Sequence, residues 1–171
     1  MNWEAIGAVG EIVGALGVIA TLLYLSRQVR RSDETARAES LRVLLDGHRD
    51  RSVVHGFASP EVSDLLAKGL TDFKSLSASE KRQFFFLFSE QVFQTQQAMQ
   101  LHGRGLLPRV DFEAWLFSTA TLIQTPGGTQ CWEILARSIT PTIRVVIDEH
   151  LAANPDTPSF LELNPLFRYE T

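Results

Sequence analysis

The chain has 171 residues, with 16 Lys and Arg against 20 Asp and Glu, a formal net charge of −4 and 44% hydrophobic residues. These averages describe one ordinary globular domain and exclude collagen, a disordered tail and, with a single cysteine, a disulfide scaffold. The acidic balance lacks the basic excess that is typical of nucleic-acid-binding domains. We therefore expect no nucleic acid among the partners.

The first predicted element is an apolar helix over residues 5–25. Of these 21 residues, fifteen are apolar, four are glycine, one is threonine and one is glutamate. At about 1.5 Å per residue the helix would span about 31 Å, the thickness of the apolar core of a bilayer. All sixteen basic residues follow Leu25. The positive-inside rule then predicts an uncleaved anchor, with the N-terminus outside and the C-terminal side in the cytoplasm.

The residues that flank this run are typical of a membrane interface. Trp3 and Tyr24 stand at its two ends, where aromatic side chains meet lipid headgroups. Arg27, Arg30 and Arg31 follow, and they either contact anionic headgroups or only set the topology. The alternative is a buried core helix of a soluble bundle, which the four glycines and the glutamate within the run favour.

Glycines within the run predict a face for close helix packing. They are spaced three, four and three residues apart: Gly7, Gly10, Gly14 and Gly17. In lipid, small residues rather than apolar burial let helices associate. Glu11 borders this face, and a carboxylate left in lipid would cost on the order of 3 kcal/mol. Two interpretations stay open: a protonated Glu11 hydrogen-bonded between helices, or an ion or proton site lining a pathway between copies.

The remainder is predicted to be helical with no strand. Residues 26–55 extend the first helix, with a break near Gly47, and mix Arg with Asp and Glu as a solvated face does. Capping signals then predict further helices, over residues 59–70, 78–102, 108–124, 125–135 and 140–153. The resulting division is a transmembrane anchor over 1–25, a juxtamembrane helical extension over 26–55, a cytoplasmic bundle over 56–153 and an extended tail over 154–171.

The predicted helix over 78–102 is the most apolar one after the anchor. It carries Phe84, Phe85, Phe86, Phe88 and Phe93. Such a wide apolar face indicates burial among several helices, and the alternative is a cofactor-binding cluster. We interpret the phenylalanines as core residues.

Motifs that carry enzyme chemistry are absent from the sequence. There is no phosphate-binding loop, dinucleotide-binding glycine motif, HExxH, GxSxG or CxxC, and no Glu-x-x-His pair of a di-iron bundle. We therefore expect no catalytic residue, no metal and no cofactor. The alternative is an enzyme with an unrecognised site in the bundle.

The opening segment MNWEAIGAVGEIVGALGVIATLLYLSRQVRRS resembles a widespread bacterial family of short membrane-anchored, all-helical proteins with no assigned function. Later positions are similar as well: Gly69-Leu70, Ser75-Leu76-Ser77, Gly105-Leu106-Leu107, Trp115, and Pro126-Gly127 with Trp132. The resemblance covers the chain to about His150. It implies an anchor in the bacterial inner membrane and a cytoplasmic helical domain, and it places Glu11 within the family pattern. It implies no activity.

These patterns together predict an all-α, non-enzymatic inner-membrane protein whose single transmembrane helix continues into a cytoplasmic bundle. We expect it to self-associate through the glycine face and to present the bundle as an oligomerisation or partner-binding module. The expected partners are membrane lipid, further copies of the chain and an unidentified protein. The alternative is a homo-oligomeric ion or proton pore lined by Glu11.

Overall fold

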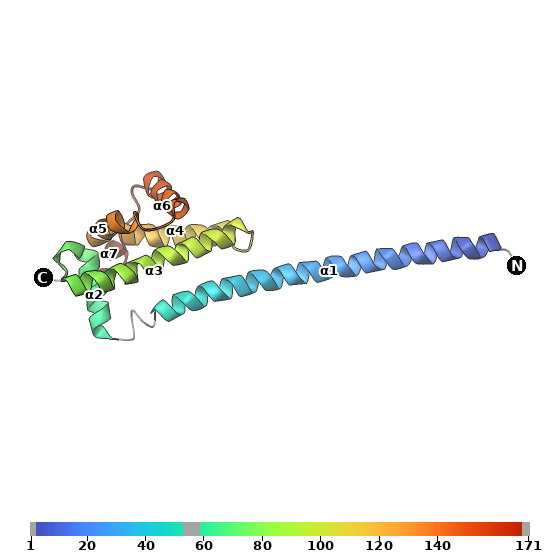
Figure 1. Cartoon of the computed structure of the whole chain (residues 1–171), viewed down its shortest axis with the longest axis horizontal. Helices are drawn as coiled ribbons and strands as arrows, with labels where there is room; N and C mark the ends of the chain where they lie inside the picture. Colours follow the sequence, from blue (N-terminus) through green and yellow to red (C-terminus); the bar gives the residue numbers. More distant parts are fainter. Residues whose placement is uncertain (1–2, 53–58, 169–171) are drawn as a thin grey trace. The chain divides into compact units, whose positions relative to one another are not determined.

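In the computed structural model, the regular elements of the described residues are all helices, which confirms the all-α prediction. The structure describes residues 3–52 and 59–168, without the side chains of 3–10, 12, 13, 48 and 50–52. The α-helices, labelled as in Figure 1, are α1 (Trp3–Ser52), α2 (Pro60–Thr71), α3 (Ala78–Gly103), α4 (Arg109–Ile123), α5 (Pro126–Leu135), α6 (Pro141–Ala153) and α7 (Phe160–Leu163). Two short 3-10 helices are η2 (Phe73–Ser75) and η3 (Pro165–Phe167).

The chain divides into two compact units, Met1–Glu39 and Ser40–Thr171, called unit 1 and unit 2 below. Unit 1 is made of the N-terminal part of α1. Unit 2 holds the end of α1 and all later helices. The first helix extends past Leu25, as predicted, but the predicted break near Gly47 is wrong because α1 continues to Ser52.

The apolar run at the start of α1 is described only in part. Within the described part of the chain, no helix is both long and apolar enough to cross a membrane. The predicted anchor over residues 5–25 lies partly outside that part, because the side chains of 5–10, 12 and 13 are not described. From Gly14 to Leu25, every residue is exposed.

Side-chain caps explain where α2, α3 and α5 begin, whereas α4 and α6 begin without a side-chain cap, next to Pro108 and at Pro141. At the start of α2, Ser59 directly precedes Pro60, and its Oγ accepts a hydrogen bond from the Val62 amide. At the start of α5, Thr125 Oγ1 accepts one from the Gly128 amide at 3.0 Å. Such a cap satisfies an amide that has no partner inside its own helix. The starts of α2 to α6 accordingly lie within one or two residues of the predicted positions.

The tail contains a helical turn that the sequence analysis did not predict. Ser159 and Glu162 form a capping box at the start of α7, and η3 follows. The rings of Phe160 and Phe167 meet edge to face, with centroids 5.3 Å apart. This segment is therefore folded back on itself locally rather than extended throughout.

The main core of unit 2 is centred on a close crossing of α2 and α5. A Cβ atom added at Gly127 would overlap the Gly69 carbonyl oxygen, and one added at Gly69 would overlap the ring of Phe84. Phe84 is fully buried there, with Leu70 beside it in the same core cluster. Glycine at both positions thus lets two helix backbones and an aromatic ring pack without an intervening side chain.

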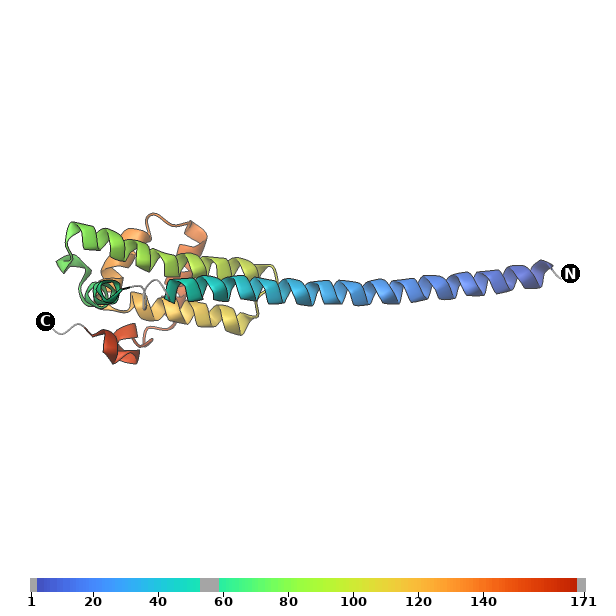
Figure 2. The same cartoon turned by 90° about the horizontal axis from the view of Figure 1, so that it is seen from below.

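The end of α1 belongs to a second, smaller core. Leu44 is 2% exposed and packs with Ala98 of α3 and with Leu107. The Gln94 side-chain amide also donates a hydrogen bond to the Gly47 carbonyl at 3.0 Å. Figure 2 shows this end of α1 alongside α3 and α4. These contacts between residues far apart in the sequence hold residues 44–47 of α1 within unit 2.

Candidate functional site

Unit 1 presents a continuous apolar helix surface. Eight large hydrophobic side chains of this part of α1 are 50–66% exposed: Leu16, Val18, Ile19, Leu22, Leu23, Tyr24, Leu25 and Val29. An apolar surface of this extent marks contact with lipid or with another chain. It is the first candidate site of the molecule.

The glycine face lies on the same helix. Gly14 and Gly17 are exposed, and a Cβ atom added at either would meet nothing within 4 Å. Glu11 is exposed as well. Three other predicted site residues, Trp3, Gly7 and Gly10, lie outside the residues whose surroundings the structure describes. Since α1 is one uninterrupted helix, the spacing of the glycines places them on one side of it.

The aromatic and basic residues predicted at the C-terminal end of the apolar run lie in that order on α1. They are all exposed: Tyr24, Arg27, Arg30 and Arg31. Arg27 lies two residues beyond Leu25, the last leucine of the run, and Arg30 and Arg31 lie five and six residues beyond it, within two helical turns. This arrangement places positive charge next to the apolar surface on a single rigid element.

A second candidate site is an apolar groove on unit 2 that the sequence analysis did not predict. It is a depression of about 360 Å³ between η2, α3 and α5, and six residues line it: Phe73, Lys81, Arg82, Phe85, Phe86 and Ile134. Phe86 is 69% exposed and Ile134 is 48% exposed. The expectation that all the phenylalanines of this helix are core residues is therefore wrong, since Phe84 and Phe88 are buried whereas Phe86 and Phe93 are exposed.

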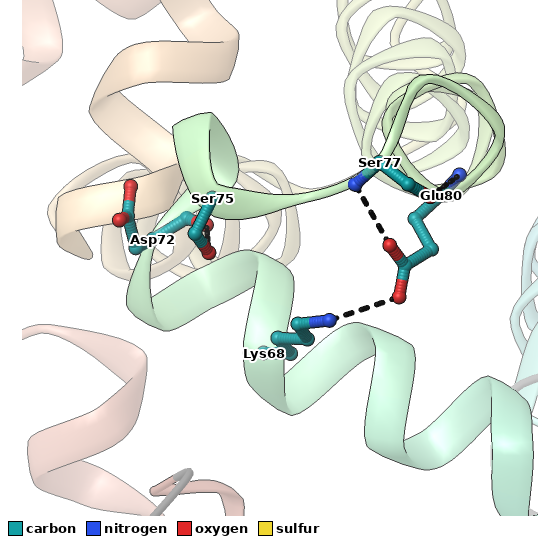
Figure 3. Close-up of polar contacts among 5 residues, drawn as sticks. All are labelled: Lys68, Asp72, Ser75, Ser77 and Glu80. Carbon is teal, nitrogen blue, oxygen red and sulfur yellow. Dashed lines mark hydrogen bonds and ion pairs between the residues drawn. The ribbon is translucent and has the colours of Figure 1, made fainter. Parts of the chain in front are cut away.

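The charges beside this groove follow from the cap of α3. Glu80 accepts hydrogen bonds from the Ser77 amide at 2.8 Å and from Lys68 Nζ at 3.0 Å, as Figure 3 shows. The Ser77 contacts, assisted by Lys68, lower the pKa of Glu80 to about 2. The Glu80 carboxylate therefore binds the Ser77 amide and Lys68. Neither Lys81 nor Arg82 has an ion pair with any side chain in the described ranges.

A polar cluster between α3 and α4 serves the fold rather than a ligand. Gln91 donates to Thr119 Oγ1 at 3.2 Å, and the hydroxyls of Thr95 and Thr119 are 2.6 Å apart. Thr95 also donates to the Gln91 carbonyl at 3.0 Å. Thr95 is fully buried and Thr119 is 1% exposed. Because these groups satisfy one another inside the core, they fix the register of the two helices.

Two groups of the kind that catalysis uses, the Cys131 thiol and the Asp148 carboxylate, are respectively buried and held by structural contacts. Cys131 is fully buried, and burial raises the pKa of its thiol to about 12, so the reactive thiolate does not form near neutral pH. Asp148 accepts a hydrogen bond from Trp132 Nε1 at 3.2 Å and pairs with Arg144 at 3.4 Å. Among the side chains that the structure describes, no three His, Cys, Asp or Glu converge as metal ligands.

The positions that carry the family resemblance have identifiable structural roles in unit 2. Gly69 and Gly127 meet at the α2–α5 crossing, and Ser77 caps α3. Gly105 has a φ of 70°, a left-handed conformation that favours glycine. Trp115 lines a second cavity of about 230 Å³, with Leu45, Ala114 and Ser118.

Comparison with known proteins gives no match to a family model, a curated protein or a solved structure. Membership of that family stays a prediction.

Proposed function

We propose that this chain is a non-enzymatic protein of the bacterial inner membrane, anchored by the start of α1. In this proposal the glycine face of α1 joins copies of the chain, and unit 2 is a cytoplasmic module for oligomerisation or partner binding. The partners are membrane lipid, further copies and a second protein.

The exposed apolar surface of unit 1 is the observation that carries the proposal. Removing a Leu, Ile or Val side chain from water contributes about 1.5–3 kcal/mol, and the surface between Leu16 and Val29 holds eight large hydrophobic side chains. A helix this apolar is unfavourable in water, so its stable surroundings are lipid or other helices. The sequence of residues 5–25 supplies the length that lipid requires.

The charge pattern supports the direction of insertion. Arg27, Arg30 and Arg31 are exposed directly after the apolar surface, and no Lys or Arg precedes residue 25. Positive charge near a membrane segment remains on the cytoplasmic side. Unit 2 would then lie in the cytoplasm.

Fractionation of bacterial cells that express the full chain tests the anchor. We expect wild-type protein in the membrane pellet after extraction with alkaline carbonate, because the apolar helix resists removal from lipid. The double variant Ile19→Lys with Leu22→Lys places two charges in the apolar run and should move the protein to the supernatant. The control Val110→Lys changes a residue of α4 that is 70% exposed, and it should leave the protein in the pellet.

Wild-type protein in the carbonate supernatant would contradict the anchor. An equal distribution of the wild type and the double variant would contradict it as well, since the apolar surface would then have no role in localisation. A cytoplasmic reporter fused after residue 171 tests the direction: its activity supports the proposed topology, and its inactivity reverses it.

A further inference from the structure

The apolar groove of unit 2 combines three features that together identify the chemistry of a partner. It is concave, most of its lining side chains are apolar, and two cations, Lys81 and Arg82, belong to its lining. Lys81 and Arg82 precede Phe85 and Phe86 by four residues, so each cation lies one helical turn from a phenylalanine on the same face of α3. An occupant must therefore present apolar and anionic groups next to each other.

The positive charge at the groove is not neutralised within the described part of unit 2. The nearest acidic residue in sequence, Glu80, is held by Ser77 and Lys68. Lys81 also closes the first turn of α3, where the positive end of the helix dipole disfavours a cation, and Arg82 follows it directly. Unit 2 carries more acidic than basic residues in total. Two adjacent cations at an unfavourable helix end thus provide a local positive patch suited to carboxylates.

The shape of the groove favours a peptide over a small molecule. A drug-sized ligand is usually enclosed over most of its surface, whereas this groove is open, with Phe86 69% exposed at its edge. Protein interfaces instead use a depression of this kind to receive one large apolar side chain, with charged groups at the rim. Phe85 packs against the main core, so the groove is preformed on its inner side.

We propose that this groove binds a short acidic segment of a partner protein. One large apolar side chain of that segment enters the depression between Phe73, Phe85 and Ile134, and carboxylates beside it pair with Lys81 and Arg82. The inference rests on the proposed role of unit 2 as a partner-binding module, and it names the chemical class of the partner.

Selection of random peptides of about twelve residues displayed on phage, against the full chain in detergent, tests this inference. We expect enriched peptides that combine Leu, Ile, Phe or Trp with Asp or Glu. The double variant Phe86→Ser with Ile134→Ser should weaken binding of a selected peptide by about tenfold or more, because it removes the apolar walls. Lys81→Gln with Arg82→Gln should weaken binding as well and reduce its dependence on salt.

Matched controls separate the groove from the general surface. Val110→Ser removes an exposed apolar side chain of α4, and Arg104→Gln removes an exposed cation at the end of α3. Both should bind the selected peptide like the wild type. Unfolding curves of all variants should stay cooperative and shift little, since Phe86, Arg82, Val110 and Arg104 are exposed, Ile134 is 48% exposed and Lys81 is partly buried. Replacing Asp and Glu of the peptide by Asn and Gln should abolish the preference for Lys81 and Arg82.

The outcomes that overturn the inference differ from those that overturn the proposed function. Enriched peptides that are basic or neutral, or that ignore the groove variants, contradict the groove while leaving unit 2 as a binding module. Enrichment of no peptide at all contradicts both. Anionic phospholipid vesicles that bind the chain only when the groove is intact, without any peptide binding, would show a lipid surface as the occupant. Loss of self-association in the groove variants, without peptide binding, would show a second copy.

Discussion

The two units use glycine in opposite ways. At Gly69 and Gly127 of unit 2, an added Cβ atom would overlap backbone or ring atoms of the same chain, so the close packing is already made. At Gly14 and Gly17 of unit 1, an added Cβ atom would meet nothing within 4 Å. The first pair is required by contacts inside the chain. A requirement at the second pair must come from outside it, from another helix that approaches this face.

This difference separates the free energy of folding of one chain from the free energy of its association with lipid or with a second chain. In unit 2, glycine allows helices to bury Phe84 and Leu70, both fully buried, and it therefore contributes to the stability of one chain. In unit 1, the large hydrophobic side chains are exposed and contribute only when lipid or a second chain covers them. Substitutions at the two kinds of glycine should accordingly change different measured quantities.

The largest expected effect is at the α2–α5 crossing. Gly127→Ala forces a methyl group against the Gly69 carbonyl, and because both partners are helix backbone, relief requires the helices to separate. We expect the free energy of unfolding to fall by about 3 kcal/mol, the upper end of the usual cost of overpacking and a large share of the stability of a small domain. Urea unfolding followed by tryptophan fluorescence measures this loss.

The control for Gly127→Ala is Gly103→Ala at the end of α3. A Cβ atom there meets nothing within 4 Å, so the substitution should be neutral or stabilising by up to about 1 kcal/mol. Labelling of Cys131 gives an independent measurement, because this fully buried thiol should react with a thiol reagent only when the core opens. Equal unfolding curves for the two variants would contradict the close contact of Gly127 with the Gly69 carbonyl at the α2–α5 crossing.

The next effect concerns association rather than folding. Gly14→Leu adds a bulky side chain to the glycine face, and it should lower the oligomer mass measured by light scattering in detergent. Unfolding of unit 2 should not change, since a Cβ atom added at Gly14 meets no atom within 4 Å in the described part of the chain. This result would place the role of unit 1 in contacts between chains.

The matched control is Ala15→Leu, which adds similar bulk to an exposed residue that has no glycine of the face three or four residues away on the same helix. It should leave the oligomer mass unchanged. An unchanged mass for Gly14→Leu, or an equal fall for Ala15→Leu, would remove the glycine face as the interface.

The same comparison explains what the sequence could predict. The starts of α2 to α6 depend on Ser, Thr and Pro residues that act within four residues, so local patterns located them. Ser159 and Glu162 carry the same local pattern, which could have predicted α7. The arrangement of the glycines in unit 1 also follows from the sequence, because helical spacing alone places them on one face.

The groove on unit 2 could not be predicted in this way. Phe73, Phe86 and Ile134 come from three elements, and only the tertiary packing of η2 and α5 beside α3 brings them together. The aromatic cluster was interpreted as core throughout, since periodicity alone did not separate the buried Phe84 from the exposed Phe86. Exposure of an apolar residue depends on how many neighbours surround its helix, which a single sequence does not contain.

The smallest expected effect is a dependence of unit 2 on acid. The pKa of Glu80 is lowered from 4.5 to about 2 by its hydrogen bonds to Ser77 and Lys68, so the folded state favours the carboxylate more than the unfolded state does. Its stabilisation is complete above pH 4.5 and is lost as the pH falls toward 2. Glu80→Gln keeps the acceptor of the capping box without the charge. The variant should therefore lose less stability than the wild type between about pH 6 and about pH 3.

Urea midpoints at the two pH values measure this difference, and the oligomer mass in detergent is recorded in parallel. Because Glu80 stabilises contacts within unit 2 alone, Glu80→Gln should leave the oligomer mass unchanged at neutral pH. A fall in mass would mean that unit 2 itself carries the association, and the two kinds of glycine would then no longer divide folding from assembly. Equal loss of stability in acid for variant and wild type would instead show that the Ser77 and Lys68 contacts do not hold the Glu80 carboxylate.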